Sequence, residues 1–260
     1  MNGTGLAIAL GVAAVVGVAF GIYPQLDLDI SALFFDPNAH AWTAEGDPWA
    51  EHARHAASWL IALIAAPAVF AVVSKLLLPG VRMLIGARAA LLLLTSLALG
   101  PGILANTILK DHWGRYRPSY LTQFGGPDGP FTAWWDPLGD CRGNCSFVAG
   151  EPSAAFWTLA PAAFAPPQWR VLAYGAALAF GAALGVLRMA GGGHFFTDVV
   201  FAGVFMFLLI WTLHGLIYRW RPTRLTDEAV ERPLARAGQA LRAALARLAR
   251  RLGARADKKL

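Results

Sequence analysis

The chain has 260 residues, of which 57% are hydrophobic and only 15% are charged, and this composition excludes an ordinary soluble domain. Its net charge of +6 is concentrated at one end, because residues 219–260 hold 12 of the 22 Lys and Arg but only 4 of the 16 Asp and Glu. A basic tail on a near-neutral apolar body argues against nucleic acid as a partner and indicates a membrane with an anionic cytoplasmic leaflet.

Six apolar stretches meet or approach the length of about 20 residues that a transmembrane helix needs. In chain order they are 5–23, 57–78, 89–109, 152–168, 171–187 and 196–217. No Lys or Arg precedes the first stretch, so we interpret it as a retained helix and not as a signal peptide. The fourth is short and contains Pro161, Pro166 and Pro167. We predict an all-α polytopic membrane protein, with a six-helix domain over 1–218 and a basic tail over 219–260.

The basic residues of the short connections predict the orientation, because Lys and Arg favour the cytoplasmic side. Arg82, Arg88 and Arg170 lie in two of these connections, whereas the acidic loop 24–56 contains Arg54 alone. Both termini are therefore predicted in the cytoplasm, and the loop 110–150 on the opposite face. We expect tryptophans near that outer boundary to form an interfacial belt; they are Trp42, Trp49, Trp59, Trp113, Trp134 and Trp135.

The tail has leucines at helical spacing with arginines between them: Leu234, Leu241, Leu245, Leu248 and Leu252. This pattern predicts a basic amphipathic helix that binds anionic lipids of the inner leaflet or pairs with another chain. A partly solvated helix without a specific partner is the alternative.

Cys141 and Cys145 are the two cysteines of the chain and lie four residues apart in a polar loop. Two cysteines do not make a metal site, because four ligands would be needed. If the loop faces an oxidising compartment, the pair is expected to form a disulfide, and two free thiols are the alternative.

Three polar segments fall on the outer side in this topology, and each contributes a cation. Lys110 and Arg117 follow the third stretch, and Arg188 ends the fifth. Fixed cations near a polar pocket suit a phosphoryl group, whose oxygens prefer charged and bidentate donors. The glycines at 191–193 allow the backbone to pass close to a bound anion. The three segments together predict an anion pocket.

His194 and Asp198 stand four residues apart at the start of the last apolar stretch, so they share one face of a helix. A carboxylate that accepts from one imidazole nitrogen fixes the tautomer and leaves the other nitrogen free to attack phosphorus. His194 is therefore the predicted nucleophile, and Asp198 the residue that orients it. This chemistry needs no metal ion and no cofactor.

The spacings Lys110-x6-Arg117-Pro118 and Arg188-x5-His194-x3-Asp198 resemble the first and third signature motifs of the type 2 phosphatidic acid phosphatase (PAP2) superfamily. The resemblance implies a six-helix core with phosphate held by the three cations. It also implies attack by His194 in a metal-independent reaction on a lipid phosphate or pyrophosphate, carried out at the periplasmic face of a bacterial inner membrane.

The middle motif departs from the family pattern Pro-Ser-Gly-His, because this chain has Val-Ala-Gly-Glu at 148–151. The resemblance leaves Gly150 as a phosphate contact, and Ser146 or Ser153 as substitutes for the missing serine. We interpret Glu151 as a general acid or a substrate contact, and a structural partner for one of the arginines is the alternative. Arg115 lies inside the first motif but off its matched positions, so we expect a loop residue or a headgroup contact.

The leading hypothesis is a membrane lipid phosphatase with lipid A phosphate as the favoured substrate. Phosphatidylglycerol phosphate, phosphatidic acid and undecaprenyl pyrophosphate are the other substrates that the resemblance allows. A lipid phosphotransferase is an alternative, in which a second lipid replaces water. A non-catalytic lipid-phosphate binding or transport protein is another, favoured by the altered middle motif and opposed by the His194–Asp198 pair. The sequence does not indicate an oligomeric state.

Overall fold

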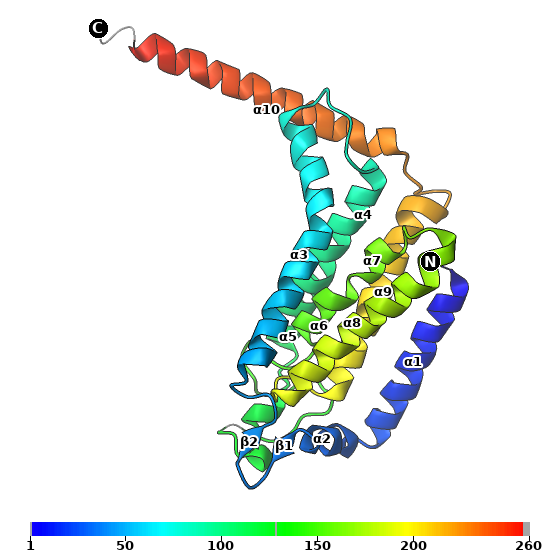
Figure 1. Ribbon diagram of the computed structural model, residues 1–260, viewed down its shortest axis with the longest axis vertical. Helices are drawn as coiled ribbons and strands as arrows, with labels where there is room; N and C mark the ends of the chain where they lie inside the picture. Colours follow the sequence, from blue (N-terminus) through cyan, green and yellow to red (C-terminus); the bar gives the residue numbers. More distant parts are fainter. Residues whose placement is uncertain (1, 128, 257–260) are drawn as a thin grey trace. The chain divides into compact units, whose positions relative to one another are not determined.

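The computed structural model describes residues 2–127 and 129–256, with the side chains of 250–256 left out of the description. The regular structure of the described chain is almost all helical (Figure 1). Two short strands, β1 (Phe35–Asp36) and β2 (Ala41–Trp42), form an antiparallel pair in which Phe35 lies opposite Trp42. The all-α class predicted from the apolar stretches is confirmed.

Five helical runs of the described chain are long and apolar enough to cross a membrane. They are α1 (Gly3–Ile22), α3 (Pro48–Leu77), the run of α4 (Ala87–Leu97), η1 (Ala98–Leu109) and α5 (Lys110–His112), the run of η4 (Pro167–Trp169) and α8 (Arg170–Ala190), and the run of α9 (Phe196–His214) and η5 (Gly215–Arg219). A helix satisfies its own backbone groups, which the bilayer interior cannot do. These runs agree with five of the six predicted stretches.

The fourth predicted span does not appear as one long helix, so the count of six is not confirmed. Its residues form two short helices, α6 (Gly150–Phe156) and α7 (Leu159–Ala162), with a turn at Trp157 and Thr158. Both pack against α8 and α9, and Trp157 is fully buried. Pro161 lacks the N–H that a continuous helix would use. The apolar character of this stretch therefore reflects burial inside the protein.

The third helical run is π-helical over Ala98–Leu109, directly before Lys110. Pro101 cannot donate a backbone hydrogen bond, and the segment η1 around it is a π-helix. The amide of Asn106 donates to the carbonyl of Pro101 over 2.6 Å, which satisfies one backbone group in this segment. The run continues into α5, so Lys110 lies near its C-terminal end.

The chain divides into two compact units. One comprises the chain up to Ile64 together with Thr95–His214, and it contains every predicted site residue. Within it, a cluster of buried side chains underlies the loop before α9; its members are Leu28, Trp42, Leu121, Phe124 and Phe195. Trp42 is only 5% exposed, so its expected place in an interfacial belt is wrong, whereas Trp49, Trp59 and Trp135 are exposed.

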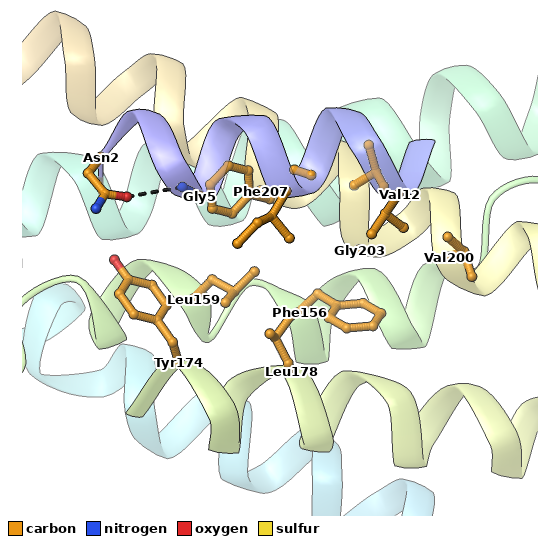
Figure 2. A pocket seen from close by; sticks show the side chains of 13 residues that line it. Asn2, Gly5, Val12, Phe156, Leu159, Tyr174, Leu178, Val200, Gly203 and Phe207 are labelled. Carbon is orange, nitrogen blue, oxygen red and sulfur yellow. Dashed lines mark hydrogen bonds between the residues drawn. The ribbon is translucent and has the colours of Figure 1, made fainter. Parts of the chain in front are cut away.

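An apolar groove of about 440 Å³ also lies in this first unit, between α1, α8 and α9 (Figure 2). Asn2 and Tyr174 lie at one end of the groove, and Val12 and Val200 lie at the other. Phe156 of α6 and Leu159 of α7 contribute to its lining. Such a surface is compatible with the acyl interior of a bilayer.

The second unit comprises Ala65–Leu94 and the chain from Gly215 onward. Its main element is α10 (Asp227–Ala256), which begins with Asp227 and Glu228 in its first turn. Lys75, which is mostly buried, pairs with Glu231 over 2.6 Å, and Arg88 pairs with Asp227 over 3.1 Å. The predicted tail is thus a helix joined to its unit by ion pairs. Leu241, Leu245 and Leu248 on it are exposed, and residues 257–260 lie outside the described chain.

Candidate active site

The structure brings the three predicted cations together around Glu151. Lys110 lies at the start of α5, Arg117 precedes a 3₁₀ turn, and Arg188 lies in the last turn of α8. Their charges are close enough to act on one another, and Glu151 is near all three. The segments come from distant parts of the sequence, so the anion pocket is formed by the tertiary fold.

His194 lies behind these cations in the loop between α8 and α9, and it is 2% exposed. Its Nδ1 lies 2.7 Å from the carbonyl oxygen of Ser146. Because a carbonyl can only accept, Nδ1 carries the proton, and Nε2 is the free nitrogen of the neutral ring. Burial lowers the pKa of His194, Arg188 and Arg117 lower it further, and Asp198 opposes them. The neutral, nucleophilic ring is therefore favoured.

Asp198 lies in the first turn of α9 and is fully buried. Its Oδ2 is 3.7 Å from Nδ1 of His194, which is an ion-pair distance and too long for a hydrogen bond. The same oxygen accepts from the backbone N–H of Phe195 over 2.8 Å and from the hydroxyl of Ser146. Asp198 thus holds Phe195, which follows His194 in the chain, and Ser146, whose carbonyl accepts from the His194 ring.

Neither serine near the middle motif is turned toward the cations. The hydroxyl of Ser146 donates to the carboxylate of Asp198, and that of Ser153 donates to the carbonyl of Ala149 over 2.8 Å. Both residues are fully buried. The hydroxyl that the family places on the phosphate therefore has no substitute at these two positions.

Glu151 is held by Arg54, a partner that the sequence did not reveal. Nε of Arg54 lies 2.9 Å from Oε2 of Glu151, and Nη2 lies 2.6 Å from Oε1, which makes a bidentate pair. Nε of Arg188 lies 3.9 Å from Oε1. Burial alone raises the pKa of Glu151, but the hydrogen bonds from Arg54 and the charges of Arg188 and Arg54 outweigh it, so the pKa is lowered. Glu151 is therefore mainly a carboxylate.

Two guanidinium groups keep donors available in this pocket. Arg117 donates from Nη2 to the side-chain oxygen of Asn144 over 2.6 Å. Within the described part of the chain, the buried Nε atoms of Arg117 and Arg188 have no hydrogen-bond partner. Buried donors are almost always paired in native proteins. N–H groups without a hydrogen-bond partner, on arginines whose charges act on Lys110 and on His194, suit an incoming anion with several acceptor oxygens.

Comparison with known proteins assigns the family. The model of the PAP2 superfamily matches residues 89–225. The chain belongs to the PAP2 superfamily. A protein of Francisella tularensis subsp. novicida named lipid A 4'-phosphatase is 34% identical over 208 residues, which cover 78% of this chain and 90% of that protein.

Two shorter matches carry the same name. The protein of Rhizobium leguminosarum is 36% identical over 107 residues, covering 41% of this chain and 46% of that protein. The protein of Rhizobium etli is 37% identical over 106 residues, covering 41% of each chain. No solved structure matches the chain. As a PAP2 member, the protein is a phosphatase, a hydrolase of phosphoric esters.

The middle PAP2 motif retains its glycine for a steric reason that the structure makes clear. Gly150 opens α6, and a Cβ atom there would lie 2.4 Å from Oδ1 of Asn106 on η1. Gly192 is constrained as well, because it has φ +64° and a Cβ atom would lie 2.5 Å from the Trp42 ring. Both glycines allow close packing of segments that carry Lys110 and His194.

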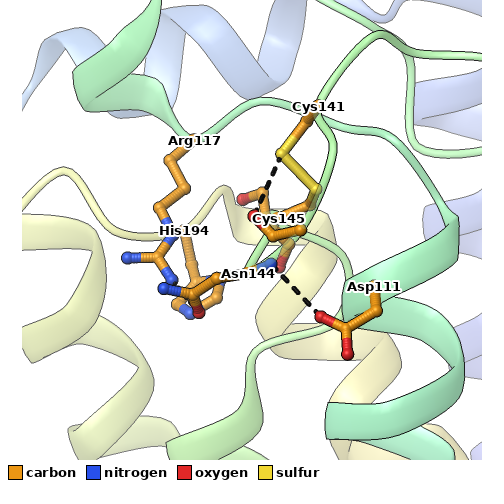
Figure 3. Close-up of a disulfide and its surroundings, with 8 residues drawn as sticks. Asp111, Arg117, Cys141, Asn144, Cys145 and His194 are labelled. Atoms are coloured by element: carbon orange, nitrogen blue, oxygen red, sulfur yellow. Dashed lines mark hydrogen bonds between the residues drawn. A yellow bond between two sulfur atoms is a disulfide. The ribbon is translucent and has the colours of Figure 1, made fainter.

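Cys141 and Cys145 form a disulfide beside the first PAP2 motif (Figure 3). The backbone N–H of Cys145 donates to the carbonyl of Lys110, and that of Asn144 donates to Asp111. Asn144, between the cysteines, is also the residue that accepts from Arg117. The disulfide loop therefore joins two phosphate-binding candidates, Lys110 and Arg117, to one rigid turn.

Proposed function

We propose that this PAP2 protein hydrolyses a phosphate monoester of a lipid A-type substrate through a phosphohistidine at Nε2 of His194. The observation that supports the proposal is that the buried Nε–H groups of Arg117 and Arg188 have no hydrogen-bond partner within the described part of the chain, while the charges of both arginines act on the His194 ring. The names of all three relatives support the substrate class.

In the proposed reaction, Lys110, Arg117 and Arg188 bind the phosphoryl oxygens and stabilise the charge that they carry in the transition state. The lone pair of Nε2 forms a bond to phosphorus while the bond from phosphorus to the lipid oxygen breaks. The departing oxygen takes a proton, for which the minor protonated form of Glu151 is the candidate donor. Water then attacks phosphorus and gives a proton to the Glu151 carboxylate, the N–P bond breaks, and inorganic phosphate leaves with the imidazole again neutral.

The charge needed for this step comes from side chains, so the proposed reaction uses no metal ion. The cations surround the pocket, and the nearest carboxylate, Glu151, is already paired with Arg54. Activity should therefore persist in the presence of a chelator. Loss of phosphate release in chelator, with recovery on addition of a divalent cation, would contradict this part of the proposal.

We further propose that the protein lies in a bacterial inner membrane with the site facing the periplasm and both termini in the cytoplasm. The disulfide next to the site supports an oxidising compartment. Basic connections and the basic helix α10 support the opposite face as cytoplasmic, where α10 would bind anionic lipids.

The proposal is tested with purified protein in detergent and a panel of lipid A, phosphatidylglycerol phosphate, phosphatidic acid and undecaprenyl pyrophosphate. We expect lipid A to give the highest kcat/KM for phosphate release, with mass spectrometry showing loss from one defined phosphate. Arg188→Gln should lower kcat/KM by roughly a hundredfold or more, because it removes a donor to the transition state.

Arg142→Gln is the matched control, since Arg142 is an exposed arginine of the same outer region. It should retain the parental rate. If no lipid of the panel loses phosphate, or if the two arginine variants behave alike, the proposed function is wrong.

A further inference from the structure

A chain of buried ionic side chains lies directly behind His194. Arg115 is fully buried, although the sequence suggested a loop residue or a headgroup contact, and the expectation of a headgroup contact is wrong. Its Nη1 lies 2.6 Å from Oδ1 of Asp198, and its Nη2 lies 2.7 Å from Oδ2 of Asp27. One guanidinium thus bridges two carboxylates that are 1% exposed or less.

Further hydrogen bonds fix Asp27 and Arg115. Asp27, in α2 (Gln25–Ala32), accepts from the backbone N–H of Thr197 over 3.0 Å and from its hydroxyl over 2.6 Å. The Thr197 hydroxyl lies 2.8 Å from Nη1 of Arg115 as well. Nε of Arg115 donates to the carbonyl of Thr132 over 2.9 Å, and its guanidinium stacks on the ring of Phe195 at 4.1 Å. Arg115 is therefore held on every side.

The opposite end of this series of buried side chains reaches His194, the proposed nucleophile. Asp198 accepts from the hydroxyl of Ser146, and the carbonyl of the same Ser146 accepts from Nδ1 of His194. A buried charge that lost its partner would have a strong tendency to move or take up a proton. Displacement of Asp198 would release Ser146 and change the tilt of the His194 ring. A misplacement of about 1 Å at a reacting atom is enough to slow a reaction about a hundredfold.

We propose that Arg115 and Asp27 are positioning residues for His194, acting through Asp198 and Ser146 and not on the substrate. The inference rests on the proposed function, because it takes His194 as the nucleophile. Groups that hold a reactive side chain typically contribute ten- to a hundredfold to activity, as outer partners of metal-bound histidines do. The chain Asp27–Arg115–Asp198–Ser146 does so here without contacting the phosphate pocket.

The first test separates orientation of the nucleophile from substrate binding. Asp27→Asn keeps the shape of the side chain but removes its charge, so kcat should fall roughly tenfold while KM stays within about twofold. Asp29→Asn is the matched control, because Asp29 lies in the same helix and is exposed. It should behave as the parent does. A parental kcat in folded Asp27→Asn, or a change confined to KM, would overturn the inference.

The second test uses the pH profile of kcat/KM, which loses activity as His194 becomes protonated. The charged groups that act on this ring are Asp198, Arg115 through it, Arg188, Arg117 and Glu151. Arg115→Met leaves Asp198 without its cation, and an uncompensated carboxylate favours the imidazolium. The acid limb should therefore move to higher pH, and Arg115→Lys should return it toward the parental position. A limb that stays in place in folded Arg115→Met overturns the inference.

His194→Asn in the same assay tests the proposed function separately. If it is as active as the parent, the nucleophile assignment fails. If it is inactive while Asp27→Asn and Arg115→Met have parental kcat and pH profiles, only the inference about positioning fails. Should Arg115→Met not fold, the kcat of Asp27→Asn decides the result, with thermal unfolding as the check that the variant is native.

Discussion

Replacement of His194 by Asn should lower the rate of phosphate release by at least about four orders of magnitude, as loss of a catalytic nucleophile does in other covalent enzymes. Asn can still donate a hydrogen bond to the carbonyl of Ser146, which in the parent accepts from Nδ1 over 2.7 Å. It has no group in the place of Nε2. The fold should therefore be retained while the bond to phosphorus cannot form, and single-turnover phosphate release with acid-quenched detection of phosphohistidine measures both.

His112→Asn is the matched control for this experiment. His112 is exposed on α5, and its Nδ1 faces carbonyls of the preceding helix. It should keep the parental rate. The parent should also remain active well into the acidic range, because burial lowers the pKa of His194 below its usual value of about 6.5. Parental phosphate release by His194→Asn would exclude this residue as the nucleophile.

The part of the site that the sequence predicted follows from topology. Once the loops after the third and fifth apolar stretches are placed on one face, Lys110, Arg117, Arg188 and His194 must lie at the same end of the bundle. Their spacing along the chain then matches a phosphate pocket, and the structure brings the same side chains together. Long apolar runs predict helices well because the bilayer allows few other structures.

The residues that the sequence did not reveal are joined by contacts between distant segments. Arg54 and Glu151 are 97 positions apart, and Arg115 and Asp27 are 88 apart. Hydrophobic periodicity carries no information about such pairs. A signal existed for Arg54, because it is the one Lys or Arg in the acidic loop 24–56, which the orientation rule predicts on the outer face. Asp27 gave no signal of this kind.

Hydropathy alone also did not separate burial inside the protein from contact with lipid in two places. The stretch 152–168 is apolar because α6 and α7 are enclosed by α8 and α9, and buried segments and lipid-facing segments have similar composition. Trp42 was expected at an interface for the same reason, yet it packs against Phe35 and Phe124 below the site. In a membrane protein, apolar sequence gives length and not the surroundings of a side chain.

The source of the proton for the leaving group should be visible in the pH dependence of kcat. If Glu151 is the general acid, only its protonated form works, so activity falls as pH rises through its pKa. Arg54 and Arg188 hold that pKa below the usual value despite burial. Arg54→Gln removes the bidentate partner, so the pKa of Glu151 rises. The alkaline limb of kcat should therefore move to higher pH, with a higher rate near neutrality.

Glu151→Gln keeps the shape of the side chain but cannot give up a proton, so it should lower kcat by about 10² to 10⁴ and abolish that limb. Glu51→Gln is the matched control, since Glu51 is an exposed carboxylate one turn from Arg54 and its charge acts on that arginine.

A different result is equally informative. If Glu151→Gln retains the parental kcat, Glu151 serves as the structural counter-ion of Arg54. Arg54→Gln should then slow the enzyme at every pH, because the loss would lie in the charge of the phosphate pocket and not in a proton.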